Sequence, residues 1–120
     1  MTYTVSKIAE KLNIPPSTIR YYDKKGLLPF VERSRGGIRQ FSEEDLSRME
    51  NILLLRRFGL SVQETETFVR LEEQGASTLH ERLSILEARK TALAEEIRLL
   101  SQTLSLLEET CSRFEHAPGP

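Results

Sequence analysis

VSKIAEKLNIPPSTIRYYDKKG, residues 5–26, predicts two short helices joined by a tight break. Four apolar residues recur at helical spacing and share one face of the first helix: Val5, Ile8, Ala9 and Leu12. The Pro15-Pro16 pair ends this helix, and Pro16 can open a second helix that Gly26 ends. Two helices arranged in this way are typical of a helix-turn-helix.

The next stretch predicts a β-hairpin. Two short β-prone segments, residues 30–31 (FV) and 38–41 (IRQF), flank the turn-forming sequence SRGG at residues 34–37. A hairpin that directly follows a helix-turn-helix makes a winged helix. We therefore expect residues 27–41 to form a wing beside the two helices.

Two supporting helices are expected after the wing. One begins at Ser42, where three acidic residues fill the first turn and suit the helix dipole, and ends at Gly59. Its expected buried face contains Leu46, Met49, Ile52 and Leu53. Residues 61–64 (SVQE) and 78–81 (TLHE) have the capping-box pattern and predict the starts of two further helices.

The last third of the sequence contains a heptad seam, in which the spacing alternates between four and three residues. Ten of its eleven positions are apolar: Leu79, Leu83, Leu86, Lys90, Leu93, Ile97, Leu100, Leu104, Leu107, Cys111 and Phe114. This pattern predicts a coiled-coil helix of roughly 54 Å at 1.5 Å per residue. A lone helix cannot bury such a seam on a small lobe, so we expect the leucines, Ile97 and Phe114 to dimerise with a second copy.

Two features of the seam leave alternatives open. Lys90 is its polar member, and it either fixes the register of the pair or packs its stem while its ammonium group stays in water. Cys111 is expected to act as a small buried hydrophobe, and a redox role is the alternative. A second apolar row (Ile85, Ala92, Leu99 and Leu106) suggests a contact beyond one partner helix.

Charge is distributed unevenly along the chain. The net charge is −1, but residues 1–41 hold eight Lys/Arg against three Asp/Glu, whereas residues 42–120 hold nine against fifteen. Ile19 and Tyr22 are expected to face the first helix, so the cationic side of the second helix faces outward. The candidate DNA-binding residues are Ser17, Thr18, Arg20, Tyr21 and Lys24 on that helix and Arg33, Arg35 and Arg39 on the hairpin. The alternative for each is a solvated surface residue.

Several other classes of protein are disfavoured. No apolar run approaches the length of a membrane span, and the start of the sequence lacks a secretory h-region, so we expect a cytoplasmic protein. One cysteine and two distant histidines, His80 and His116, give no disulfide framework, no metal-ligand spacing and no expected cofactor. We find no catalytic grouping or phosphate loop in the sequence and do not expect an enzyme.

Residues 7–29 (KIAEKLNIPPSTIRYYDKKGLLP) and 33–41 (RSRGGIRQF), with the helix pair and coiled-coil helix that follow, resemble the MerR family of transcriptional regulators. The resemblance implies a homodimer joined by an antiparallel coiled coil, which binds a pseudo-palindromic operator. It also implies bending and untwisting of the promoter spacer for RNA polymerase. By motif position, Arg20 and Tyr21 would be helix contacts and Arg39 a wing contact. Family wings often carry tyrosines where this chain has Ile38 and Phe41, which places more weight on the wing arginines.

The sequence thus predicts a mainly α protein with a winged helix-turn-helix lobe. Residues 1–75 form this DNA-binding lobe, residues 76–115 the dimerisation helix and residues 116–120 a flexible tail. We expect a short MerR-like regulator without a C-terminal effector domain, whose effector the sequence does not identify. Metal-sensing relatives resemble one another in paired cysteines near the end of this helix, and Cys111 stands alone. The alternative is a coiled-coil interaction module whose basic lobe docks on an acidic protein.

Overall fold

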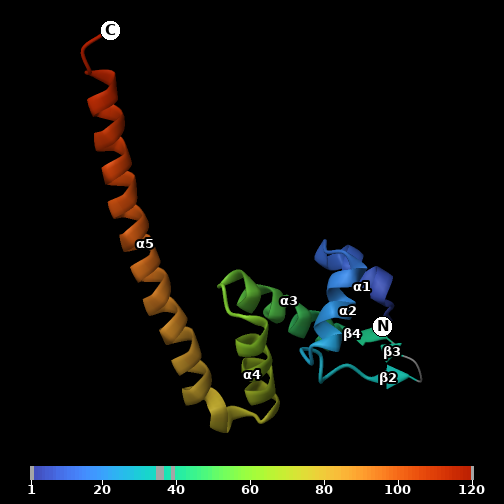
Figure 1. The fold of residues 1–120 in the computed structure, drawn as a ribbon. Helices are drawn as coiled ribbons and strands as arrows, with labels where there is room; N and C mark the ends of the chain where they lie inside the picture. The colour runs from blue at the N-terminus through green and yellow to red at the C-terminus, as the bar shows by residue number, and fades with distance from the viewer. Residues whose placement is uncertain (1, 35–36, 39, 120) are drawn as a thin grey trace. The chain divides into compact units, whose positions relative to one another are not determined.

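The computed structural model describes residues 2–34, 37–38 and 40–119 of the protein. It divides into two compact units, Met1–Ile85 and Leu86–Pro120. Figure 1 follows the chain from the short helices and strands of the first unit into one long helix, which makes up most of the second. The protein is mainly α, as predicted.

The helix-turn-helix consists of α1 (Val5–Leu12) and α2 (Pro16–Lys24). Asn13 ends α1 in the left-handed conformation, with φ of 56°. Pro16 occupies the first turn of α2, where its missing N–H has no helical partner to lose. Ile8 and Ile19 are fully buried, which confirms the predicted inner faces of the two helices.

The strands form two small antiparallel pairs. β2 (Arg33–Ser34) pairs with β3 (Gly37–Ile38) and makes the predicted hairpin. β1 (Thr2–Tyr3) pairs with β4 (Phe41–Ser42), a pairing that the sequence analysis missed. The Tyr3 hydroxyl donates a hydrogen bond to Glu43, and this bond, with burial as a second cause, raises the pKa of Tyr3. The second pair therefore ties the start of the chain to the start of α3.

The predicted wing strands were partly wrong. Phe30 and Val31 lie in a turn, and Val31 is buried in the core, so packing overrides their preference for strand. Phe41 is fully buried and belongs to β4 rather than to the hairpin. Its side chain is a core residue, so comparison with a wing tyrosine does not apply to Phe41.

The supporting helix α3 (Glu43–Arg57) begins as predicted. Ser42 and Asp45 form a capping box, in which each side chain accepts a hydrogen bond from the other residue's backbone N–H. The buried apolar residues of α3 are Met49, Ile52 and Leu55. Leu46 and Leu53 are only half-buried, because they flank the stripe that faces the core, so the predicted buried face was shifted.

The next helix, α4 (Val62–Glu73), also begins at its predicted capping box. The Ser61 hydroxyl accepts from the Glu64 N–H at 3.0 Å, and the Glu64 carboxylate accepts from the Ser61 N–H at 2.8 Å. Gly59 follows α3 with φ of 92°, a conformation that side chains disfavour. Local signals therefore set the break between α3 and α4.

The long helix begins where predicted, but its start is capped differently. A short 3-10 helix, η1 (Ala76–Thr78), leads directly into α5 (Leu79–Glu115). The Thr78 N–H donates to the Gly75 carbonyl, and the Thr78 hydroxyl lies 2.7 Å from the Leu71 carbonyl. The predicted capping box at residues 78–81 was therefore wrong, because the turn before α5 already engages Thr78.

Candidate nucleic-acid interface

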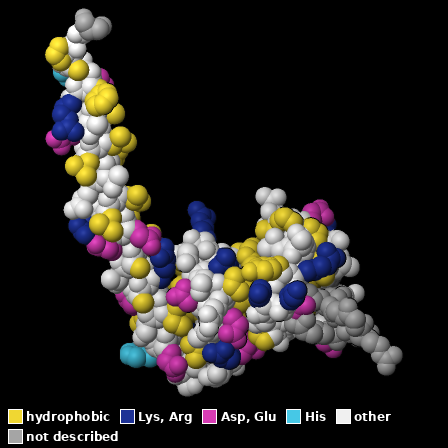
Figure 2. All heavy atoms as spheres, viewed as in Figure 1, with side chains coloured by type: hydrophobic (Ala, Val, Ile, Leu, Met, Phe, Trp, Pro, Cys, Tyr) yellow, Lys and Arg dark blue, Asp and Glu magenta, His cyan; other side chains and the backbone are white. Residues whose placement is uncertain are grey.

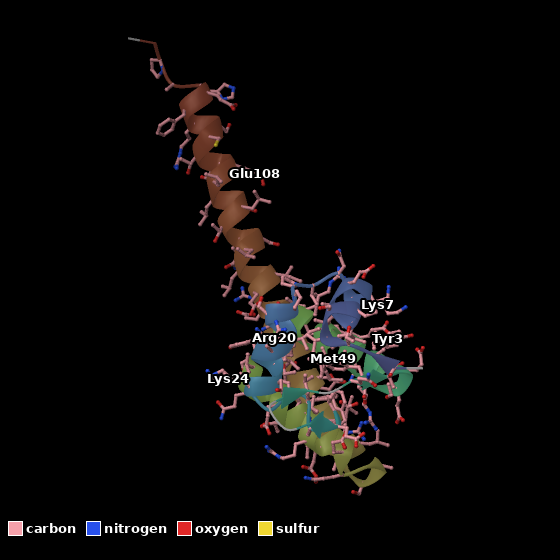
Figure 3. The ribbon with its side chains drawn as sticks, turned by 90° about the vertical axis from the view of Figure 1, so that its right-hand side faces the viewer. Tyr3, Lys7, Arg20, Lys24, Met49 and Glu108 are labelled. Atoms are coloured by element: carbon pink, nitrogen blue, oxygen red, sulfur yellow. The ribbon has the colours of Figure 1, made fainter. Side chains whose placement is uncertain are left out.

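The outer side of α2 carries the candidate recognition residues. Ile19 and Tyr22 are buried, so the intervening residues face away from the core. Ser17, Arg20, Tyr21 and Lys24 are exposed, and Thr18 is half-buried. Arg20 and Lys24 lie one helical turn apart on α2 (Figure 3). Four of the five predicted α2 residues are therefore accessible to a ligand, and the fifth is partly accessible.

Tyr21 has a defined setting on this surface. Its ring lies 6.0 Å from the Tyr22 ring, and the Lys25 ammonium lies 5.8 Å from the centre of the Tyr21 ring. The side chain remains 46% exposed, so it can still reach a ligand. Lys25 adds a cation that we did not select from the sequence, although it stands directly after Lys24. Its distance to Tyr21 is in the range of a cation–π contact.

The start of α2 is also suited to an anion. Pro15 is the N-cap residue, and no side-chain hydrogen bond caps the helix. No acidic residue lies in the first turn, so the positive end of the helix dipole has no local carboxylate that would compete with a phosphate. Ser17 lies in this first turn and is exposed.

Of the three predicted wing arginines, Arg33 lies among the described residues. Arg33 begins β2, and its backbone pairs with Ile38 of β3. Arg35 and Arg39 lie outside the described residues. The roles of all three arginines in DNA binding stay predictions.

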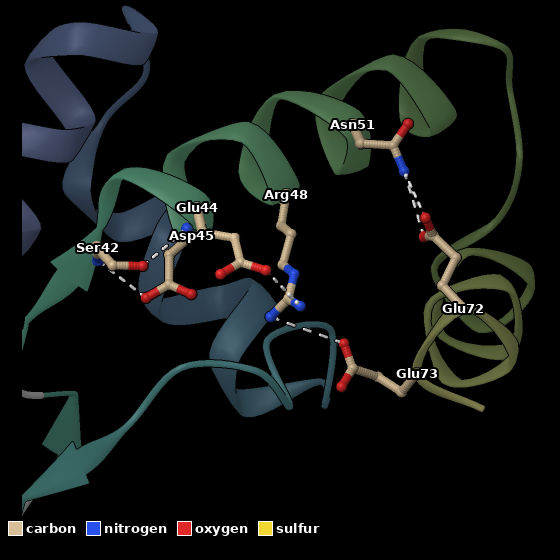
Figure 4. A network of polar contacts seen from close by, with 7 residues as sticks. All are labelled: Ser42, Glu44, Asp45, Arg48, Asn51, Glu72 and Glu73. Atoms are coloured by element: carbon tan, nitrogen blue, oxygen red, sulfur yellow. Dashed lines mark hydrogen bonds and ion pairs between the residues drawn. The ribbon is translucent and has the colours of Figure 1, made fainter. Parts of the chain in front are cut away.

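A polar network connects α3 to α4 in the same unit (Figure 4). Arg48 forms ion pairs with Glu44 at 3.1 Å and Glu73 at 4.0 Å. The Asn51 amide donates to both carboxylate oxygens of Glu72 at 3.2 Å. The Arg48–Glu44 pair is local to α3, whereas the contacts with Glu72 and Glu73 join positions more than 20 residues apart, for which the sequence gave no signal.

Part of this network lines a hollow of about 430 Å³ between α3 and α4. Burial raises the pKa of Glu72, whereas the nearby Arg82 and Arg48 and the Asn51 hydrogen bond oppose that rise. Arg48 also lies 5.2 Å from the centre of the Phe30 ring. These contacts hold α3, α4 and the loop after α2 together, and we assign the network a structural role.

The heptad seam of α5 is largely exposed in the single chain. No residue of α5 is buried, and Leu100 and Phe114 are 69% and 80% exposed. Hydrophobic side chains recur along the helix in Figure 2. An apolar surface of this length is typical of a helix that packs against another chain.

Among the described residues, no helix is long and apolar enough to cross a membrane. In residues 2–34, 37–38 and 40–119, no three His, Cys, Asp or Glu side chains are grouped as metal ligands would be.

A helix-turn-helix with an exposed cationic second helix, followed by a two-stranded wing, defines a DNA-binding regulator of the winged helix-turn-helix class. Residues 3–71 match the model of the MerR HTH family of regulatory proteins. A helix-turn-helix-type transcriptional regulator of Haemophilus influenzae is 37% identical over 117 residues, which cover 98% of this chain and 87% of the relative. The chain therefore belongs to the MerR family of transcriptional regulators.

Solved structures agree with this assignment. The chain is similar to HiNmlR, described as a MerR family regulator lacking the sensor domain and crystallised bound to promoter DNA, with 37% identity and a TM-score of 0.73. The match covers 98% of this chain and 93% of that one. A MerR family regulator from Bacillus thuringiensis is 32% identical, with a TM-score of 0.72 and coverage of 94% and 99%.

Proposed function

We propose that this regulator binds duplex promoter DNA as a homodimer, with one winged helix on each half of a pseudo-palindromic operator. The observation that carries the proposal is the exposed polar side of α2, where Arg20 and Lys24 lie one turn apart beside Tyr21. Arginine and lysine donate to phosphates and base edges, and the major groove is wide enough to admit an α-helix such as α2. HiNmlR, a relative of nearly equal length, was crystallised on promoter DNA.

The proposed DNA contacts fall into two groups. Arg20, Tyr21 and Lys24, with Ser17 and Thr18 at the start of α2, approach the major groove and its flanking phosphates. Arg33, Arg35 and Arg39 act from the wing on the backbone or the minor groove. We assign this DNA-binding work to residues 1–75, dimerisation to residues 76–115 and neither role to residues 116–120.

The proposed dimer joins two α5 helices in an antiparallel coiled coil. The exposed heptad seam supports this, because a monomer would leave its apolar residues in water. A two-fold dimer presents two recognition helices with opposite orientation, which matches a pseudo-palindromic operator. Dimerisation and operator binding are therefore expected to be lost together.

The proposed regulation follows the family. The dimer bends and untwists an over-long promoter spacer so that RNA polymerase can engage both promoter elements, and the deformation energy depends on the spacer sequence. We propose that the protein acts in the cytoplasm, where promoter DNA and RNA polymerase meet in its bacterial relatives. We propose no enzymatic activity for it. Its partners are then promoter DNA, a second copy and RNA polymerase.

Fluorescence anisotropy over a salt series tests the proposal. The full chain is titrated into labelled duplexes from the region upstream of its own gene and into random duplexes of equal length. We expect the upstream DNA to bind at least about a thousandfold more tightly, with affinity that falls steeply as salt rises. Equal affinity for both DNAs would contradict sequence-specific regulation and favour a basic docking surface.

A further inference from the structure

The residues along the α5 seam restrict how two copies of the helix can align. We propose that two α5 helices pair in one antiparallel register, in which Ile97 lies opposite the partner's Leu100 and Lys90 lies against the partner's Glu108. The two-fold axis then passes between residues 98 and 99. This inference rests on the proposed antiparallel homodimer and adds which residues of the two copies meet.

Heptad positions limit the possible registers. The seam residues at position a are Leu83, Lys90, Ile97, Leu104 and Cys111, and those at position d are Leu79, Leu86, Leu93, Leu100, Leu107 and Phe114. In an antiparallel pair each a residue packs opposite a d residue, so allowed registers differ by one heptad. Two of them engage ten of the eleven seam positions, whereas the registers shifted one heptad further in either direction engage eight.

We name these two registers by the residue opposite Ile97. In the 97/100 register Ile97 faces the partner's Leu100, and in the 97/93 register it faces the partner's Leu93. The 97/100 register engages Leu83 through Phe114 and omits Leu79. The 97/93 register engages Leu79 through Cys111 and omits Phe114. Apolar contact, charge and symmetry then distinguish them.

Apolar contact favours the 97/100 register. Phe114 is the largest side chain of the seam and is 80% exposed in the single chain, whereas Leu79 is 60% exposed. Covering the aromatic ring removes more apolar surface from water than covering the leucine. The 97/93 register leaves that ring without a seam partner.

The position of Lys90 also favours the 97/100 register. Its ammonium lies 3.9 Å from Glu87 of the same helix, at an e position on the flank of the seam nearest the a residues. In the 97/100 register Lys90 lies opposite the partner's Leu107, so the partner's Glu108 falls on the same flank. Lys90 then separates two carboxylates that would otherwise repel. In the 97/93 register the corresponding neighbour is the partner's Ser101, which carries no charge.

Glu96 is the third discriminating residue. It accepts hydrogen bonds from Arg89 of its own helix at 3.0 and 3.2 Å, at g positions on the opposite flank. The 97/93 register brings the Glu96 residues of the two copies face to face at the two-fold axis, where two like charges meet and the paired Arg89 side chains weaken their repulsion. The 97/100 register places the partner's Thr103 there instead. Glu96 thus favours the 97/100 register only slightly, whereas Phe114 and Lys90 carry the choice.

Disulfide mapping with the natural Cys111 tests the register directly. Cys111 faces the partner's Leu86 in the 97/100 register and the partner's Leu79 in the 97/93 register. The two Cys111 residues are separated by 25 helical positions in the 97/100 register, or about 37 Å, too far for a disulfide. One cysteine at a time is introduced into the full chain as L86C, L79C or L93C. L93C reports the register that lies one heptad from the 97/100 register on the side away from the 97/93 register.

The variants are oxidised mildly as dimers, and the linked peptides are identified by mass spectrometry. We expect L86C to form an intersubunit disulfide with Cys111 at least ten times faster than L79C or L93C. The control L86C/C111S should not form this link. A second pair on the C111S background, L93C/L104C, should also cross-link, because residues 93 and 104 face each other in the 97/100 register.

Charge reversal gives a readout that needs no cysteine chemistry. K90E places three acidic residues together and should weaken dimerisation by roughly tenfold. Adding E108K places a lysine of one helix against the two glutamates at positions 87 and 90 of the other and should recover most of the loss. The matched control is E109K, which makes the same charge change at an f position on the outer side of the helix and should give no recovery.

The outcomes separate the register from the dimer itself. Preferred cross-linking of L79C or L93C, a dimer without any preference, or equal recovery by E108K and E109K would overturn the 97/100 register and leave the antiparallel dimer in place. A Cys111–Cys111 disulfide would show parallel pairing and contradict the proposed antiparallel dimer. Monomers of the unmodified chain in sedimentation would contradict the proposed dimer before any register is considered.

Discussion

At the scale of single residues, the two groups of arginines are expected to differ in what they recognise. Arg20 on α2 is proposed to contact base edges, whereas Arg35 belongs to the wing tip expected from the sequence. We predict that R35A weakens operator and random DNA by similar factors and lowers the salt slope by about one per protomer. R20A should cost about 1–3 kcal/mol at the operator and less on random DNA.

Binding of both variants to both DNAs over a salt series distinguishes these roles. The double variant K7A/K11A, on α1, serves as a control for the loss of positive charge on the same unit. Selective loss of operator binding in R35A would mean that the wing reads sequence or groove shape. A uniform loss in R20A would make Arg20 a phosphate contact.

Glu72 allows a prediction about pH. Burial raises its pKa above the ordinary value of 4.5, so the folded protein binds a proton in the interval just above 4.5 that the unfolded chain has released. The contribution of Glu72 to stability therefore falls as pH rises through this interval. In E72Q the amide oxygen still accepts from Asn51 and does not ionise.

Urea unfolding of the wild type and E72Q between pH 4 and pH 8 measures this contribution. The stability of E72Q relative to the wild type should increase as pH rises above 4.5 and then level off once Glu72 is ionised in both states. E109Q, at an exposed position on α5, is the control and should give a much flatter difference. A difference for E72Q that does not vary with pH would contradict the assigned effect of burial.

At the scale of elements, local signals set the helix starts. Ser61 and Glu64 satisfy two backbone N–H groups at the start of α4. S61A is expected to lower the free energy of unfolding of the first unit by about 1 kcal/mol, because one of these groups loses its side-chain partner. S105A, an exposed substitution within α5, should leave that transition unchanged, and denaturant unfolding of both variants provides the comparison.

The difference between local signals and contacts between distant residues explains which elements were predictable from the sequence. Pro16, Ser42 and Ser61 mark helix starts by chemistry that acts within one turn, and the structure places helices there. The pairing of β1 with β4 joins residues about 40 positions apart and has no local signal. Thr78 failed as a predicted cap because the turn that precedes it supplies its partners.

The candidate site shows the same difference between local patterns and contacts that depend on packing. The helical period correctly separated buried Ile19 and Tyr22 from the exposed residues of α2. Lys25 was missed because its link to the site is the nearby Tyr21 ring. The contact of Asn51 with Glu72 was missed because it depends on how α3 packs against α4. Residue pattern therefore predicts faces of elements, whereas contacts between elements require the structure.

At the scale of the whole molecule, dimerisation and DNA binding are expected to be linked. L100E/L104E places four like charges in the seam of a dimer that would otherwise bury leucines. We predict monomers at micromolar concentration by sedimentation and loss of operator binding in the same variant. E81Q/E109Q alters charges outside the seam and should remain a dimer that binds, so operator binding by monomeric L100E/L104E would separate the two functions.

Footprinting on the DNA upstream of the chain's own gene and its neighbours tests the central claim most directly. One bound dimer should protect two half-sites related by a pseudo-two-fold axis, within a promoter spacer and with cleavage altered between them by the bend. L100E/L104E should remove the whole footprint at once. Protection of a single half-site by the wild type, or uniform weak protection at concentrations that also coat random DNA, would contradict a dimeric, sequence-specific regulator.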